Sequence, residues 1–255
     1  MQFGCYAQVA KEKLQEIPEI DLILGVNEKN EIVEYIEEMT NGNSHEQVSD
    51  VANQEEFVEF GPVTYTEKTR AVIKIQDGCN QFCSYCIIPY ARGRIRSRRP
   101  EMVVIEIKKI AEQGIKEVVL TGIHIASYGK DFTEEIVSDI SKDFQYEKPK
   151  KEFYLIDLLE ELQNIDGIER IRLGSLEPTL ITEDFVTRLS KLSKICDQFH
   201  LSLQSGCDST LKRMNRKYTT KEFEKGVSYL RKAYPQVHLT TDIIVGFPRR
   251  NRKRI

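Results

Sequence analysis

Three cysteines lie within eight residues of one another and form the strongest chemical signal in the sequence. Cys79, Cys83 and Cys86 have the spacing CxxxCxxC, and they follow an apolar stretch at residues 71–75 that predicts a β-strand. In a βα barrel, the carboxyl end of a strand is where sites are built. Thiolates are soft ligands that favour zinc or iron-sulfur clusters, so the pattern predicts a metal centre.

The number of ligands separates these two kinds of centre. A structural zinc site uses four ligands, usually two CxxC pairs or one CxxC with a histidine pair, and no such partner lies near the three cysteines in the sequence. Three cysteines on a cluster of four irons leave one iron open, which can chelate S-adenosylmethionine. Electron transfer would then release a 5′-deoxyadenosyl radical. A zinc knuckle and buried cysteines without a metal are the alternatives.

Short apolar strands alternate with helices around the three cysteines. Pro100 at a first-turn position and a capping box from Thr219 to Glu222 mark two of the helix starts. The alternation predicts parallel βα units, and hence an α/β fold with a partial (β/α) barrel. Residues 127–152 are mostly polar and predict a solvated surface insertion. The strand candidates are residues 71–75, 117–121, 170–175, 200–204 and 238–245.

The chain before the barrel has a different character. Residues 19–39 predict a β-turn-α unit, because a short apolar run and a glycine precede apolar residues at helical spacing. The following stretch is rich in Asn, Ser, Gly and Glu and predicts a linker, with a candidate edge strand at residues 56–60. We therefore divide the chain into an N-terminal unit at 1–45, a linker at 46–68 and a core at 69–255.

Composition limits the kinds of protein and partner. The chain of 255 residues has 40% hydrophobic residues and no apolar run long enough to span a membrane, which takes roughly 18 residues or more. We expect no membrane partner and a cytoplasmic location. Residues 1–60 hold 14 acidic and 3 basic side chains, whereas residues 61–255 hold 26 acidic and 34 basic ones. The basic part is where we expect a polyanionic partner.

Five stretches resemble the methylthiotransferase branch of the radical S-adenosylmethionine superfamily, and within it the tRNA threonylcarbamoyladenosine methylthiotransferases. The stretch from Gly78 to Gly93 contains the three cysteines and is the most specific. The resemblance runs over nearly the whole chain. The supporting stretches are residues 4–8, 120–124, 172–178 and 201–206.

The resemblance implies an enzyme with two 4Fe-4S clusters. The barrel cluster makes the radical, and an auxiliary cluster supplies sulfur for C2 of N6-threonylcarbamoyladenosine at position 37 of tRNA. A second S-adenosylmethionine supplies the methyl group. The implied partners are the anticodon stem-loop of tRNA and an electron donor such as flavodoxin or ferredoxin. Residues 1–45 then correspond to the C-terminal part of an N-terminal methylthiotransferase domain.

The resemblance also assigns individual residues. Cys5 matches the last of three ligands of the auxiliary cluster, and the two earlier cysteines have no counterpart in this chain. Ser175 and Glu177 are expected near the ribose of S-adenosylmethionine, with Gln204 and Asp242 on the inner wall of the barrel. The alternatives are an exposed carboxylate for Glu177 and a side chain satisfied by backbone for Gln204.

Five arginines follow the cysteine stretch within eight residues. Guanidinium groups bind phosphate well through paired donors, so this run predicts contacts with an RNA backbone. The alternatives are that Arg92 or Arg94 anchors the cofactor carboxylate or pairs with nearby acids, or that the run is a solvated face. The arginines are Arg92, Arg94, Arg96, Arg98 and Arg99.

The leading hypothesis is therefore a radical methylthiotransferase acting on threonylcarbamoyladenosine in tRNA. Residues 87–93 and 121–124 favour this branch over relatives that modify isopentenyladenosine in tRNA or an aspartate of a ribosomal protein. A non-catalytic zinc or RNA-binding module is the alternative from another class. Because Met1 leads directly into the Gly4 motif, and a basic run at 249–255 stands where the family continues, we expect a chain truncated at both ends, not fully active and lacking the last strand and the RNA-binding β domain.

Overall fold

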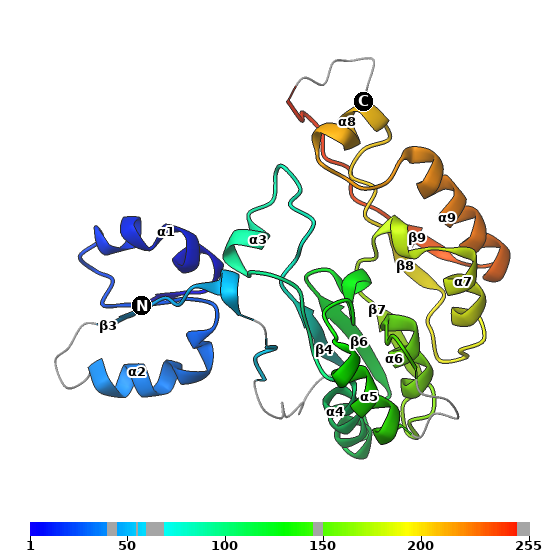
Figure 1. Ribbon diagram of the computed structural model, residues 1–255, viewed down its shortest axis with the longest axis horizontal. Coiled ribbons are helices and arrows are strands. Elements are labelled where there is room, and N and C mark those ends of the chain that lie inside the picture. The colour runs from blue at the N-terminus through cyan, green and yellow to red at the C-terminus, as the bar shows by residue number, and fades with distance from the viewer. Residues whose placement is uncertain (40–44, 55, 60–68, 145–149, 249–255) are drawn as a thin grey trace.

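A computed structural model of the protein describes residues 1–39, 45–54, 56–59, 69–144 and 150–248. Figure 1 shows a small N-terminal unit beside a larger α/β core, with α3 (Ile88–Ala91) between them. None of the helices in these ranges is long and apolar enough to cross a bilayer.

The N-terminal unit is a three-stranded parallel sheet in the order β1-β2-β3, with a helix after each of its first two strands. The predicted β-turn-α unit is confirmed by β2 and α2. Strand β3 lies at the predicted start of the linker, whereas residues 56–59 form no strand and Phe60 lies outside the described residues. The elements are β1 (Gln2–Phe3), α1 (Cys5–Gln15), β2 (Leu22–Leu24), η1 (Glu28–Glu31), α2 (Ile32–Met39), β3 (His45–Gln47) and η2 (Val51–Asn53).

The core sheet has the order β5-β4-β6-β7, in which β4, β6 and β7 are parallel and the short β5 is antiparallel to β4. Two isolated parallel bridges, Ile171 with Ile195 and Leu176 with Leu201, continue it to the parallel pair β8 and β9. The predicted partial barrel is thus confirmed as a curved, mostly parallel sheet. The strands are β4 (Arg70–Asp77), β5 (Arg96–Ser97), β6 (Glu117–Gly122), β7 (Arg170–Leu173), β8 (Gln198–His200) and β9 (His238–Thr240).

Helices pack on the sheet and enclose one continuous apolar core. Pro100 begins α4 and the predicted capping box at Thr219 and Glu222 begins α9, so both predicted helix starts are confirmed. The solvated insertion was wrong in part, because Val137 and Ile140 of α5 are buried in the core. The helices are α4 (Pro100–Glu112), η3 (Ile125–Ser127), α5 (Glu134–Asp143), α6 (Leu155–Leu162), η4 (Pro178–Leu180), α7 (Glu183–Leu189), α8 (Asp208–Arg213) and α9 (Thr220–Ala233).

Candidate functional site

The three cysteines lie on the loop between β4 and α3, at the carboxyl edge of the core sheet. Cys79 and Cys83 are buried and Cys86 is half-buried. Burial raises the pKa of the Cys79 thiol, and the negative charges of Cys83, Cys86 and Glu177 raise it further. A metal that binds this sulfur would displace its proton to solvent, because the charge of the metal stabilises the buried thiolate.

Gln76 fixes the start of the cysteine loop at the end of β4. Its side chain is fully buried at the end of β4. The amide nitrogen donates to the carbonyl of Asp77 and, at 2.8 Å, to that of Gly78, while the amide oxygen accepts the backbone N–H of His124 at 2.7 Å. The side-chain amide of Gln76 therefore links the end of β4 to the residues that follow β6, so the cysteine loop begins from a fixed position.

The segment 213–216, which begins at the last residue of α8, holds the loop from the other side. The Ser84 backbone N–H donates to the carbonyl of Met214 at 3.1 Å, and the Ser84 hydroxyl donates to that of Arg213 at 2.9 Å. The Asn215 amide donates to the carbonyl of Phe82 at 2.8 Å. These bonds join residues about 130 positions apart in sequence, so the loop is fixed by tertiary structure rather than by local turns.

Glu177, beyond the end of β7, is the buried anion of the site. It accepts hydrogen bonds from His124 Nε2 at 2.7 Å and from Gln81 Nε2 at 3.2 Å, and Arg216 Nη2 lies 3.3 Å from its other oxygen. Burial alone would raise the pKa of this carboxyl, but the hydrogen bond and charge of His124, with the charge of Arg216, outweigh it and lower the pKa. The carboxylate therefore stays ionised inside the protein.

The other residues predicted to bind S-adenosylmethionine lie along the carboxyl ends of β7, β8 and β9. The Ser175 hydroxyl is 2.7 Å from that of Ser202. Gln204 has a positive φ of 63°, and its backbone N–H donates to the carbonyl of Asp242 at 2.9 Å. The Asp242 carboxylate is exposed and lies 3.5 Å from His200 Nε2. These groups line one edge of the sheet together with Glu177.

Cys5 lies at the first turn of α1, where the N-terminal unit meets the core. Arg92, at the end of α3, donates from Nε to Cys5 Sγ at 3.0 Å, and its Nη1 lies 3.4 Å from the carboxylate of Asp77. One guanidinium thus links the predicted auxiliary ligand to the strand that precedes the cysteine loop.

The five predicted RNA-binding arginines divide into two groups. Arg96 and Arg98 are buried, the first beside Asp77 and the second against Glu59 and Glu106. A buried guanidinium already paired with carboxylates cannot reach an RNA backbone, so the predicted RNA contact is wrong for Arg96 and Arg98, which pair with acids inside the protein instead.

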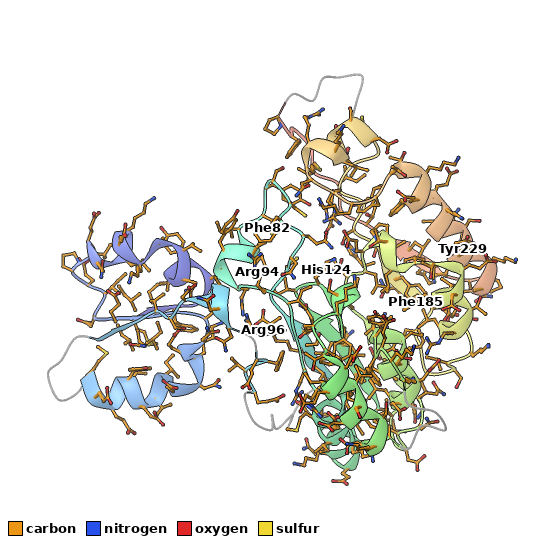
Figure 2. All side chains as sticks on the ribbon, in the orientation of Figure 1. Phe82, Arg94, Arg96, His124, Phe185 and Tyr229 are labelled. Atoms are coloured by element: carbon orange, nitrogen blue, oxygen red, sulfur yellow. The ribbon has the colours of Figure 1, made fainter. Side chains whose placement is uncertain are left out.

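The remaining three arginines are accessible to different degrees. Arg94 is exposed, and its guanidinium lies 4.7 Å from the centre of the Phe82 ring. Arg99 pairs with Glu101 at the start of α4 and keeps a side chain 41% exposed. Arg92 is mostly covered by its contacts with Cys5 and Asp77. Figure 2 shows Phe82, Arg94 and His124 in the middle of the molecule, and Phe185 and Tyr229 on the helices α7 and α9.

The donors around the cysteines fit an iron-sulfur cluster. Cys79 Sγ receives the backbone N–H of Gln81 at 3.4 Å, and Cys83 Sγ receives Nη1 of Arg216 at 3.3 Å. Hydrogen bonds to ligand sulfurs are typical of such clusters and tune them. Within the described ranges, no three His, Cys, Asp or Glu side chains are gathered around a single ion. A four-iron cluster differs, because each cysteine binds a separate iron.

Sequence reasoning missed two residues of the site. His124 lies within a stretch that supported the family resemblance, but its bond to Glu177 depends on the pairing of β6 with β7. Arg216 carries no signal in the sequence, since it reaches Cys83 across 133 positions.

Comparison with curated proteins gives two kinds of relative. Threonylcarbamoyladenosine tRNA methylthiotransferase MtaB of Bacillus subtilis (strain 168) is 38% identical over 252 residues, which cover 96% of this chain and 51% of that protein. A tRNA-2-methylthio-N(6)-dimethylallyladenosine synthase of Clostridium botulinum (strain Loch Maree / Type A3) is 37% identical over 249 residues, which cover 96% and 51%. The chain therefore spans about half the length of these curated relatives.

Solved structures share the fold at low sequence identity. The cobalamin-dependent S-adenosylmethionine radical enzyme OxsB, with aqua-cobalamin and S-adenosylmethionine bound, matches 94% of this chain and 35% of its own, with a TM-score of 0.58 and 11% identity. The radical S-adenosylmethionine methyltransferase TsrM of Kitasatospora setae, with tryptophan and a cofactor analogue bound, matches 72% and 32%, with a TM-score of 0.52 and 19% identity.

The family model of the radical SAM superfamily matches residues 73–255, which include most of β4, the cysteine loop and the rest of the described core. Together with the methylthiotransferase relatives, this match confirms the resemblance inferred from the cysteine stretch. The matched residues contain the three-cysteine loop at the carboxyl end of the first core strand, and the chain belongs to the radical S-adenosylmethionine superfamily.

Proposed function

We propose that the protein takes part in methylthiolation at C2 of N6-threonylcarbamoyladenosine at position 37 of tRNA. The observation that carries this proposal is the cysteine loop at the carboxyl end of β4, clamped so that Cys79 and Cys83 each receive an N–H donor. By name, one of the relatives described above is a tRNA methylthiotransferase for threonylcarbamoyladenosine, and the other is a synthase of 2-methylthio-N(6)-dimethylallyladenosine in tRNA. Their identities of 38% and 37% do not separate the two adenosines, so the choice of threonylcarbamoyladenosine rests on residues 87–93 and 121–124.

Cys79, Cys83 and Cys86 would hold a 4Fe-4S cluster in this proposal. When bound, the cluster supplies the electron that cleaves S-adenosylmethionine and so starts radical chemistry. The chain's own contribution is to hold the loop, through Gln76 and segment 213–216, and to shield it from water. Cys79 and Cys83 are each only 8% exposed, which limits access of solvent to the sulfurs.

Glu177, Ser175, Gln204 and Asp242 are the proposed contacts of S-adenosylmethionine. Within the described part of the chain, Glu177 Oε1 is buried and accepts no hydrogen bond, although Arg216 lies within ion-pair distance of it. A buried carboxylate oxygen without a donor is costly, and a ribose hydroxyl could supply one. Ser175 and Asp242 present a hydroxyl and a carboxylate along the same edge.

Cys5 is the proposed ligand of the auxiliary 4Fe-4S cluster in the whole protein. Its thiol lies beside Arg92 at the junction of the N-terminal unit and the core, where α1 packs on α3, the helix that follows the cysteine loop. Flavodoxin or ferredoxin is the proposed source of electrons, and the cytoplasm the proposed location, as for other proteins that modify tRNA.

Arg94 and Arg99 are the proposed phosphate contacts for the tRNA anticodon stem-loop. Arg92 is a less accessible member of the same proposed set, since it contacts Cys5 and Asp77. Arg94 lies next to Phe82, and Tyr90, which is 63% exposed, packs edge-on against the same ring at 5.8 Å. The exposed ring of Tyr90 on α3, the partly exposed ring of Phe82 and the Arg94 guanidinium suit unpaired bases, which stack on such groups.

Nucleoside analysis tests the proposal. The chain, with any native sequence that flanks it, is expressed in a host that lacks its own methylthiotransferases, and bulk tRNA is digested and measured by mass spectrometry. We expect the 2-methylthio form of threonylcarbamoyladenosine, and none when Cys79, Cys83 and Cys86 are replaced by alanine. A methylthio group on isopentenyladenosine instead would overturn the substrate choice. Zinc in place of iron and sulfide after anaerobic reconstitution would overturn the radical chemistry.

A further inference from the structure

Arg216 connects a cysteine sulfur to a buried carboxylate inside the core. Its side chain is 7% exposed. Nη1 donates to Cys83 Sγ at 3.3 Å, and Nη2 lies 3.3 Å from Glu177 Oε1. Nε donates to the Tyr218 hydroxyl at 3.2 Å, and the guanidinium lies 4.9 Å from the centre of the Tyr218 ring. Each of the three guanidinium nitrogens therefore has a partner, and the partner of Nη1 is the sulfur of Cys83.

The partners of Arg216 are themselves held in place. Glu177 is 3% exposed and is fixed by His124, whose other ring nitrogen is 2.7 Å from the Ser127 hydroxyl. The Tyr218 hydroxyl donates to the carbonyl of Leu203 at 2.8 Å. The guanidinium keeps its charge, because arginine stays protonated in proteins. A charged donor with this many supports has a fixed direction.

A fixed cation on a ligand sulfur acts on the electron affinity of a cluster. Reduction adds one negative charge to the cluster, and a buried positive charge that donates a hydrogen bond to the sulfur stabilises the reduced form more than the oxidised form. The effect is larger in a site shielded from water, because screening is weak there. Among the described residues, the hydrogen-bond donor to Cys79 Sγ is the neutral backbone N–H of Gln81, at the longer distance of 3.4 Å.

The geometry points to Arg216 as a positioning residue that raises the reduction potential of the cluster through Cys83 and is held in place by Glu177. This inference rests on the proposed function, since it requires a cluster on the three cysteines. Arginine is suited to the role because its planar fork serves Cys83, Glu177 and Tyr218 at once, whereas a lysine ammonium is a single point of charge.

A redox titration of the reconstituted protein, followed by electron paramagnetic resonance, tests the inference. Arg216→Gln should make the cluster about tenfold harder to reduce, which is a fall in midpoint potential of about 59 mV for a one-electron couple. Arg216→Lys keeps the charge but loses the three-way contact, and should give a smaller fall. The matched control is Lys212→Gln, which removes the same charge from an exposed position on α8 and should leave the potential unchanged.

Each other outcome has a stated meaning. If Arg216→Gln carries a cluster with the unchanged midpoint potential, the inference is overturned while the proposed function stands. If neither Arg216 variant retains a cluster although circular dichroism shows an intact fold, Arg216 retains the cluster rather than tunes it, and the inference is again overturned. If the unmodified protein binds no iron and sulfide, the proposed function itself fails.

Discussion

The N-terminal unit and the core differ sharply in how much apolar surface they bury. Among the described residues, 35 buried hydrophobic side chains form the cluster of the core, whereas Ala7, Leu14 and Ile23 form that of the N-terminal unit. The small unit also leaves Val33 61% and Tyr6 56% exposed. Stability in one chain is not uniform, and a unit with so small a core depends on its neighbours.

The contacts that hold the N-terminal unit lie next to the cysteine loop. Arg92 bonds Cys5, α1 packs on α3, and the Gly93 backbone passes close to the carbonyl of Val51 in η2. The part of the core nearest the proposed cluster therefore also anchors the less stable unit. We infer that local opening of the N-terminal unit leaves the core folded.

Paired leucine truncations give the largest expected difference between the two regions. Leu120→Ala removes a fully buried side chain from β6, and we expect it to lower the free energy of unfolding of the core by about 3–5 kcal/mol. Leu14→Ala removes a side chain 3% exposed from α1 and should leave the core transition in place. Hydrogen exchange in increasing denaturant resolves the two regions. Equal loss of core protection in both variants would show that they unfold as one.

Gly93→Ala should separate the two units without harming either core. Gly93 has φ +74°, and a Cβ there would lie 2.0 Å from the Val51 carbonyl oxygen. We expect about 1–2 kcal/mol of backbone strain together with displacement of η2, seen as faster exchange in peptides of the N-terminal unit. The control is Gly114→Ala, which has φ +83° but no atom within 4 Å of the added Cβ. Similar exchange at the junction in both variants would exclude the steric contact as the cause.

The sequence predicted the strands and the cysteine loop better than it predicted the polar contacts between side chains. Apolar runs predicted β4, β6 and β7, and spacing predicted the cysteine loop at the end of β4, because both depend on residues that are close in sequence. The strand candidate at 200–204 was wrong in position, since it shares only His200 with β8, and the candidate at 238–245 was too long, since β9 ends at Thr240. The sequence did not show which arginines of the run are buried. Arg96 lies in β5 with its side chain buried beside Asp77, and this contact is seen only in the folded structure. Arg216 could not be found, because its role depends on the position of Cys83 after folding.

Acid sensitivity should be a property of the core, through Asp157 in α6. Its carboxylate, 8% exposed, accepts from Lys150 Nζ at 2.8 Å, Arg188 Nη2 at 2.8 Å and the Tyr154 backbone N–H at 2.7 Å. Burial would raise the pKa of Asp157, but these three partners outweigh it and lower the pKa. The stability that Asp157 contributes is therefore present above its unfolded pKa, about 3.9, and is lost as pH falls through the lower folded value.

Asp157→Asn should accordingly cost about 1–3 kcal/mol at pH 7, and the cost should shrink as pH falls below about 4. Urea unfolding of both proteins between pH 7 and pH 3 measures this difference. Exchange in α1 should be unaffected, since Asp157 contacts only core residues among its described partners. A cost that stays constant down to pH 3 would contradict the assignment of the lowered pKa to this carboxyl.

The smallest expected effect, and the most local, is that of Arg92→Gln. The variant loses the hydrogen bond to Cys5 and the ion pair with Asp77, and we expect about 1 kcal/mol less protection of α1 with unchanged protection of β4 and β6. Arg99→Gln, which removes the same charge beside Glu101, is the control and should leave α1 unchanged. Hydrogen exchange by mass spectrometry reads both regions at once. If protection of α1 does not change in Arg92→Gln, the packing of α1 on α3 holds the N-terminal unit and the contact with Cys5 does not.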